Sequence, residues 1–93
     1  MSYEELVDMA RRGILERDFA TARAYLEHAI DQDDRRPEAF NLLGVVEAIR
    51  GERGEAMARW RVALALAPNS EPALTNLRYA TRRPRVYGAL ALG

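Results

Sequence analysis

Few side chains in this chain have the types and spacing that catalysis or metal binding requires. His28 is the single histidine, Asp31 is the one possible metal ligand three or four residues from it, and cysteine is absent. Zinc, thiolate and multi-histidine sites need more ligands than these. The acidic stretch 31–34 lacks the glycine and glutamate of a calcium loop, because Arg36 and Leu42 occupy those positions. We therefore expect no metal, no cofactor and no enzymatic activity, and a solvated surface position for His28.

Glu47 is the one acid within the otherwise apolar stretch 39–49. A buried carboxylate needs a charged or hydrogen-bonding partner, or else its pKa rises. Arg23 is a suitable partner, and Arg59 and Arg61 are expected to face outward from the following helix. We therefore expect a structural ion pair at this position rather than catalysis.

Length and composition limit the chain to one modest domain. Its 93 residues are 48% apolar and 30% charged, which is typical of a globular protein and not of a disordered or membrane-embedded one. Fourteen arginines balance fourteen acids without any lysine, so a general nucleic-acid binder is not expected. The acidic start is unlike a secretory signal, and no apolar run approaches the ~18 residues that span a bilayer. We expect a cytoplasmic protein without a membrane partner, and the arginine usage is typical of a GC-rich, bacterial genome.

An internal repeat with an offset of 34 residues organises the sequence. Apolar positions recur at this offset, and small residues align with small ones, as in the series Leu6, Phe40, Leu74, the series Met9, Leu43, Leu77, and the pairs Ala22 and Ala56, Leu26 and Trp60. This spacing predicts a helical domain over 1–84, with repeats at 3–36 and 37–70 and an end helix at 71–83. A short apolar tail follows at 85–93.

Each repeat contains the pattern of two helices. Ser2 begins a capping box, Asp18 is suited to cap the second helix, and Pro37 fits the first turn of the third. Pro84 is expected to end the last helix. The third helix is apolar nearly all round, so it needs neighbours on several sides and belongs in the middle of a stack. The sequence therefore predicts an all-α fold of five helices.

These residues resemble the tetratricopeptide repeat. The second unit carries most of the pattern, with Phe40, Leu43-Gly44, Ala56, Trp60, Ala63 and Pro68, and departs from it at Glu47, where the family has a tyrosine. The first unit matches more weakly. The resemblance implies a right-handed superhelical stack of antiparallel helix pairs, whose first helices line a concave groove that captures peptides or helices of partner proteins.

Position by position, the resemblance implies a groove with an apolar centre and polar anchors. Its lining would be Val7, Arg11, Asn41, Val45, Ile49, Asn76, Tyr79 and Arg82. Arg11, Asn41 and Asn76 would be the polar anchors, whereas plain packing is the alternative for Val45 and Ile49. The family's clamp for acidic chaperone tails is not expected, because only two full repeats are present and only two of its matching positions are suitably polar, among Val7, Arg11, Leu42, Pro72 and Asn76.

From Val86 onward the tail is mostly apolar and contains no charged side chain, so its exposure would favour aggregation. We expect it to be covered by its own stack, by a second copy or by a partner; the alternative is a disordered stub. The candidate contacts for an oligomer are Val86, Tyr87, Leu90 and Leu92. The expected function is a protein–protein interaction adaptor, and the alternative is a scaffold that self-associates, as a homodimer or larger oligomer, through its tail or end faces.

Charge is unevenly distributed along the stack. Residues 1–34 carry nine acids and four arginines, whereas residues 71–93 carry four arginines and one acid. Complementary ends favour contact between copies or steering of polar partners. The arginines near the end, from Arg78 to Arg85, are suited to a solvated end face, to an acidic partner or to a phosphate.

Overall fold

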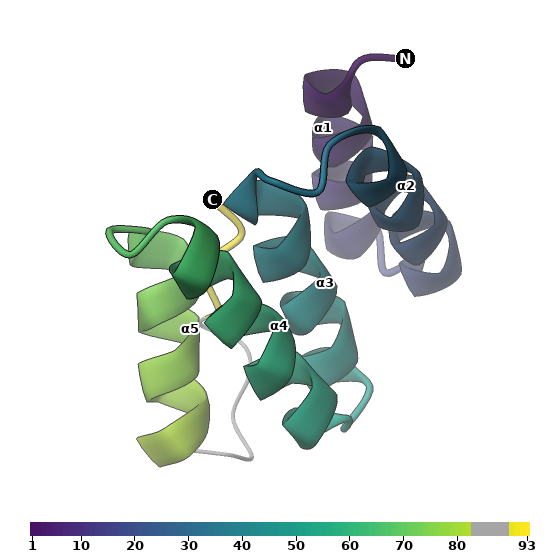
Figure 1. Ribbon diagram of the computed structural model, residues 1–93. Helices are drawn as coiled ribbons and strands as arrows, with labels where there is room; N and C mark the ends of the chain where they lie inside the picture. The colour runs from purple at the N-terminus through teal and green to yellow at the C-terminus, as the bar shows by residue number, and fades with distance from the viewer. Residues whose placement is uncertain (83–89) are drawn as a thin grey trace.

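The chain forms a stack of helices in a computed structural model, which describes residues 1–82 and 90–93 (Figure 1). The helices in chain order are α1 (Tyr3–Leu15), α2 (Phe19–Gln32), α3 (Pro37–Ile49), α4 (Arg53–Leu66) and α5 (Glu71–Arg82). Consecutive helices pack against each other, and α3 contacts all four others. No strand occurs in the two described ranges. The predicted all-α stack of antiparallel helix pairs is confirmed.

Local side-chain bonds fix where the first helices begin. The Ser2 hydroxyl accepts from the Glu5 N–H at 3.1 Å, and the Glu5 carboxylate accepts from the Ser2 N–H at 2.8 Å. The Asp18 carboxylate accepts from the Thr21 N–H at 3.3 Å at the start of α2. Pro37 is the first residue of α3, where its missing N–H leaves no hydrogen bond unmade. The predicted capping box, cap and proline position are confirmed.

The turn within each helix pair repeats the same backbone conformation. Arg17 and Gly51, which are 34 residues apart, both have positive φ, at 61° and 85°. This left-handed region is strained for a residue with a Cβ. No heavy atom lies within 4 Å of the position that a Cβ at Gly51 would take, so strain is the only cost of adding one.

Replacing Gly51 with alanine should therefore lower the free energy of unfolding by about 1 kcal/mol. Urea denaturation of both chains measures the change. Gly54→Ala is the matched control, because its added Cβ also meets nothing within 4 Å and lies in α4 without positive φ. Equal stability of the Gly51→Ala variant and the parent chain would contradict the assignment of strain.

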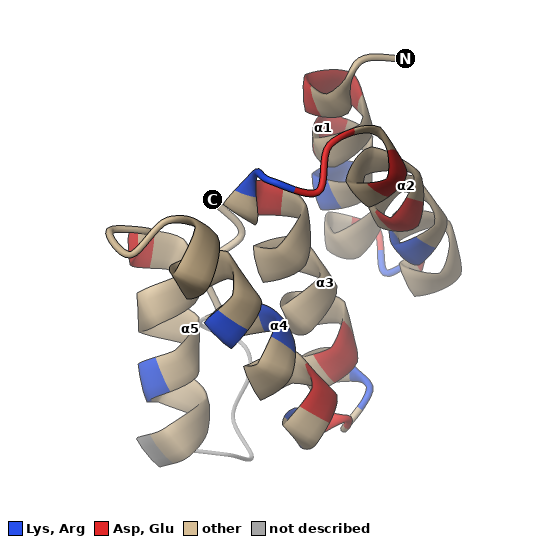
Figure 2. Ribbon diagram, in the orientation of Figure 1, with Lys and Arg blue, Asp and Glu red and all other residues tan. Residues whose placement is uncertain are grey.

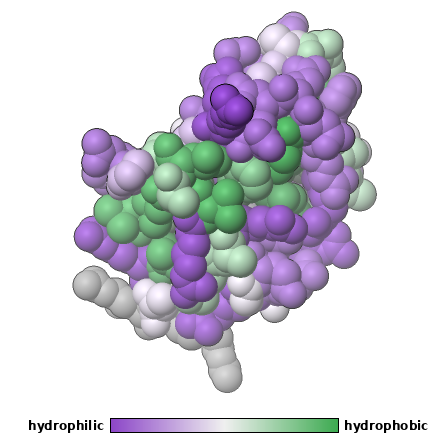
Figure 3. Space-filling view, viewed as in Figure 1, coloured by the Kyte–Doolittle hydropathy of each residue, from purple (hydrophilic) through white to green (hydrophobic). Residues whose placement is uncertain are grey.

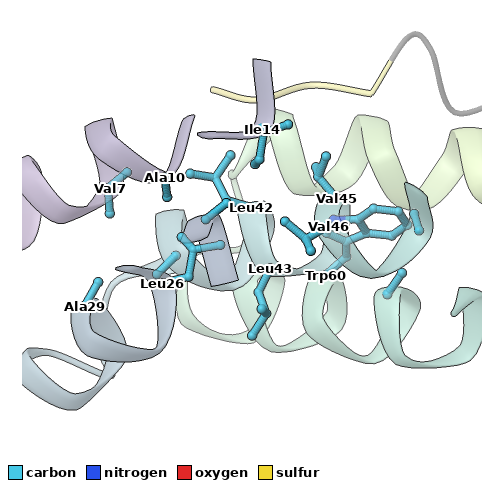
Figure 4. Close-up of a cluster of buried hydrophobic side chains, with 14 of the residues drawn as sticks. Val7, Ala10, Ile14, Leu26, Ala29, Leu42, Leu43, Val45, Val46 and Trp60 are labelled. Atoms are coloured by element: carbon cyan, nitrogen blue, oxygen red, sulfur yellow. The ribbon is translucent and has the colours of Figure 1, made fainter. Parts of the chain in front are cut away.

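The core is built around α3, whose residues 41–48 are all buried. Leu42, Val45 and Val46 are among its largest buried side chains, and Figure 4 shows them between α1, α2 and α4. Trp60 of α4 is fully buried beside Gly44, and its Nε1 donates to the Asn41 carbonyl at 3.1 Å. The indole is thus fixed both by packing and by a hydrogen bond, and the predicted central position of α3 is confirmed.

Glu47 is a buried carboxylate with two arginine partners. Its Oε1 accepts from Arg59 Nε at 3.1 Å, and its Oε2 lies 3.8 Å from an Arg23 guanidinium nitrogen. The ion pair with Arg23 was predicted. The outward orientation predicted for Arg59 is wrong, because its long side chain reaches back from α4 to satisfy the buried charge. The three residues join α2, α3 and α4 across the boundary between the repeats.

Tyr3 replaces the missing cap of α3. Arg36 at the N-cap makes no side-chain cap bond, but the Tyr3 hydroxyl accepts from the Ala39 N–H at 3.1 Å and lies 3.3 Å from Glu38 Oε1. The Arg36 guanidinium stacks over the Tyr3 ring at 4.2 Å and bonds Glu4 at 2.7 Å. Burial of the phenol raises the pKa of Tyr3 from 10.0 to about 12, and the nearby Glu38 carboxylate adds to this.

Tyr3→Phe should lower the free energy of unfolding by about 1–2 kcal/mol near neutral pH, because the Ala39 N–H loses its acceptor. Because the pKa of Tyr3 is higher in the folded than in the unfolded chain, the neutral phenol contributes its full stability below about pH 10. This contribution is lost as pH rises toward 12. Thermal melts from pH 8 to pH 11.5 should therefore show a steeper alkaline loss in the parent chain than in the variant. Parallel profiles would contradict a role for this hydroxyl.

Candidate peptide-binding groove

The last four residues of the chain lie on the side of the stack formed by α1, α3 and α5. Figure 1 shows this segment passing between α3 and α5 behind α4. Hydrogen bonds join it to Arg11 of α1, Asn41 of α3 and Asn76 of α5. These are the three side chains that the sequence resemblance assigned as polar anchors. Residues 90–93 thus fold back on their own stack, which is one of the alternatives left open for the tail.

Asn76 holds one residue of the segment by its main chain. Its Oδ1 accepts from the Ala91 N–H at 2.5 Å, and its Nδ2 donates to the Ala91 carbonyl at 2.8 Å. The same Nδ2 donates to Asn41 Oδ1 at 2.8 Å, and Asn41 Nδ2 donates to the Ala91 carbonyl at 3.1 Å. Asn76 is fully buried and Asn41 is 2% exposed. The two amides therefore form a rigid, buried pair that recognises main-chain groups of an extended segment.

Arg11 extends this recognition by two residues toward the end of the chain. Its Nε donates to the Leu92 carbonyl at 2.9 Å, and one of its terminal nitrogens lies 3.5 Å from the Gly93 carbonyl. Asp8 orients the guanidinium through a bond of 2.6 Å. Main-chain groups of three consecutive residues are thus contacted from α1, α3 and α5.

An apolar pocket of about 310 Å³ lies beside the segment. Its lining is Ile14, Leu15, Arg17, Val45, Ile49, Leu90 and Leu92. Val45 has no exposed surface and Ile49 is half-buried, so both pack in the core and also form the wall that faces the leucines. The two leucines supply the opposite wall of this pocket.

A second hollow, of about 360 Å³, adjoins Gly93 at the other end of the segment. It lies between the start of α3 and the connection from α4 to α5, and its lining includes Glu38, Glu71 and Pro72. The groove therefore continues past the position of Gly93. Its lining at this end contains two acids and no arginine.

The other predicted site residues have different positions. Val7 is packed in the core with 3% of its surface exposed, and Tyr79 is half-buried on α5. Arg82 ends α5, but its side chain lies outside the described part of the chain, as do Val86 and Tyr87. Sequence reasoning missed Leu15 and Arg17 as lining residues of the apolar pocket and Ala91 as the residue that Asn76 holds.

The remaining surface differs from the groove in character. Acidic side chains gather at the start of α1 and between α2 and α3, whereas α5 carries an exposed arginine at Arg78 (Figure 2). Figure 3 shows an apolar area on the face turned away from the tail, and on α4 Val62 and Leu66 are 40% and 37% exposed. Among the described residues, no helix is long and apolar enough to cross a membrane, and no cluster of three potential metal ligands occurs.

Comparisons of the chain with protein-family models, with curated proteins and with solved structures find no match.

Proposed function

We propose that this chain is a protein–protein interaction module of the tetratricopeptide-repeat type, whose groove captures an extended segment of a partner protein. One observation carries the proposal: Arg11, Asn41 and Asn76 converge from three helices on the main chain of residues 91–93. Side chains that bind main-chain groups accept many sequences, and the neighbouring pocket adds selectivity through apolar side chains. This arrangement is suited to binding rather than to bond-breaking chemistry.

The burial of the two asparagines supports this role. Burying two side-chain amides in a small helical protein costs free energy unless their hydrogen bonds are made. Here an extended segment supplies the missing hydrogen-bond partners. When that segment leaves, the groups at the floor of the groove need another main chain or water. The groove is therefore preorganised for an extended ligand, which lowers the entropy cost of capture.

Selection from a displayed peptide library on the immobilised full-length chain tests this proposal. Peptides that bind through the groove should lose at least tenfold in affinity when Asn76 is replaced with alanine in a chain that already carries Leu90→Ser and Leu92→Ser, because two main-chain hydrogen bonds disappear while residues 90–93 compete in neither chain. Thr75→Ala is the matched control, since Thr75 is exposed on the same helix. Selected peptides that bind the Leu90→Ser, Leu92→Ser chain equally with and without Asn76→Ala would contradict binding in this groove.

Self-association is the second candidate function, because the groups of Arg11, Asn41 and Asn76 that hold residues 90–93 can equally bind the tail of a second copy. Light scattering over a range of concentrations distinguishes the two functions. A mass of 10.5 kDa at all concentrations is expected for a chain that holds its own tail. A mass that rises to a stable multiple would favour exchange of tails between copies.

A further inference from the structure

The geometry points to a specific ligand class for the groove: an extended segment of another protein with leucine, a small residue and leucine in succession. Residues 90–93 act as an internal competitor that such a segment displaces. This inference rests on the proposed peptide-binding function and adds to it the chemistry of the partner and the regulation of the site. Main-chain recognition, the shape of the pocket and the second hollow each carry one part of it.

Main-chain recognition defines the central position of the ligand. Asn76 binds both the N–H and the carbonyl of Ala91, as the neighbouring strand of a sheet would. This requirement is met by every residue except proline, which has no N–H. A ligand therefore needs an extended backbone and a free N–H at this position. Nothing in this contact identifies the side chain there.

The pocket defines the flanking positions. In an extended chain, residues two apart project toward the same face. Leu90 and Leu92 accordingly line one pocket together, opposite Ile14, Val45 and Ile49, while Ala91 lies between them. Both leucines are half-buried and pack against the core. The partner therefore needs apolar side chains of leucine size at both flanking positions.

Competition with residues 90–93 determines which additional contacts a partner segment must make. A tethered segment competes at an effective concentration of the order of millimolar, so an identical free peptide binds weakly to the intact chain. A ligand with residues after the glycine position gains contacts in the second hollow, where Gly93 is the lining residue that residues 90–93 contribute. Because Glu38 and Glu71 lie there, a lysine or arginine after the glycine position is favoured. Such a ligand displaces residues 90–93 through contacts that these four residues do not make.

A fluorescent peptide with the sequence Ala-Leu-Ala-Leu-Gly-Lys is the probe that tests this inference. Its affinity is measured by fluorescence anisotropy with the full-length chain and with a full-length variant that combines Leu90→Ser and Leu92→Ser. The variant should bind the probe at least tenfold more tightly, because its own tail no longer competes. Leu66→Ser, on α4 away from the groove, is the matched control and should bind like the parent chain.

Two altered probes test the ligand chemistry. A probe with N-methylalanine between the leucines keeps every side chain but lacks the N–H that donates a hydrogen bond to Asn76. It should bind the variant at least tenfold more weakly than the unmethylated probe does. A probe that ends in glutamate instead of lysine should bind more weakly at low salt. Equal affinity of the parent chain and the variant, or of the methylated and unmethylated probes, would overturn the inference.

A titration of the isotopically labelled parent chain gives a second readout that does not depend on the variant. Excess probe should move the amide resonance of Ala91 toward its unfolded position as the tail is displaced, and an unchanged resonance at saturation would overturn the inference. If library peptides bind through Asn76 but this probe does not, the ligand class is wrong while peptide binding stands. If nothing binds through Asn76, both proposals fail. Tail exchange between copies would replace the external partner with a second copy and also overturn the inference.

Discussion

Replacing Gly44 with alanine is expected to lower the free energy of unfolding by about 3 kcal/mol. An added Cβ would lie 2.8 Å from Trp60 Cδ1 and even closer to Nε1. The indole cannot yield easily, because it is fully buried and its Nε1 is bonded to the Asn41 carbonyl on the same helix as Gly44. Either α3 and α4 separate or the tryptophan loses that bond, and each costs free energy.

Thermal melting measures this prediction, and the midpoint should fall by roughly 12–24 °C for a domain of this size. Gly54→Ala is the matched control, because its Cβ meets nothing within 4 Å in α4 and helices favour alanine over glycine. That control should keep or raise the melting temperature. A Gly44→Ala variant that melts with the parent chain would show that α3 and α4 do not pack as closely as described.

Replacing Asn76 with alanine is expected to release the tail and to lower the free energy of unfolding by about 2 kcal/mol. The substitution removes both bonds to Ala91 and leaves the Asn41 side chain without its buried donor. Once the segment leaves, water can bond the Asn41 side chain and the main-chain groups of Ala91, which limits the loss of unfolding free energy. The Ala91 amide, held by Asn76 in the parent chain, should then exchange with solvent at least tenfold faster in the variant.

Hydrogen exchange followed by nuclear magnetic resonance measures this second prediction at single residues. Thr75→Ala should leave the exchange rate of the Ala91 amide unchanged, since Thr75 is exposed and makes none of these bonds. Asn76→Asp distinguishes the contributions of the two hydrogen bonds to Ala91, because aspartate keeps the acceptor oxygen and lacks the donor N–H. An Ala91 amide that exchanges equally fast in the parent chain and in Asn76→Ala would contradict the contact.

The helical architecture was predictable because its signals are local or periodic. The 34-residue offset aligned Ala22 with Ala56 and Leu26 with Trp60, and all four are fully buried. The apolar character of α3 predicted its central place, and the burial of residues 41–48 agrees with it. The ion pair between Glu47 and Arg23 followed from the cost of burying a lone acid.

The sequence left several positions open for the tail, so its contact with the groove of its own stack could not be predicted. Hydrogen bonds from Asn76 to Ala91 join a side chain to main-chain groups, and main-chain groups are the same at nearly every residue. The residue that Asn76 holds therefore could not be identified from the chemistry of its contacts alone. The alternation of large and small side chains at Leu90, Ala91 and Leu92 was the available signal, because it is typical of an extended segment with one apolar face.

The role of Arg59 shows a second limit of sequence reasoning. Its neighbours on α4 place it on the flank of the helix, where arginine usually faces water. A long side chain can bury its stem and still bring its charge to a distant partner, and Arg59 reaches Glu47 in this way. Helical periodicity specifies the direction in which a side chain leaves the backbone, but it does not specify where a long side chain ends.

The central claim, that the groove holds an extended segment, is tested most directly by a spin label at the end of the tail. The chain has no cysteine, so Gly93→Cys gives one labelling site, and a Cβ there meets only Pro72 Cγ at 3.6 Å. The label should broaden the amide resonances around Arg11, Asn41 and Asn76. A mixture of labelled unenriched chains with enriched unlabelled chains should show no such broadening. Resonances in the groove that stay sharp in the labelled chain would contradict the claim.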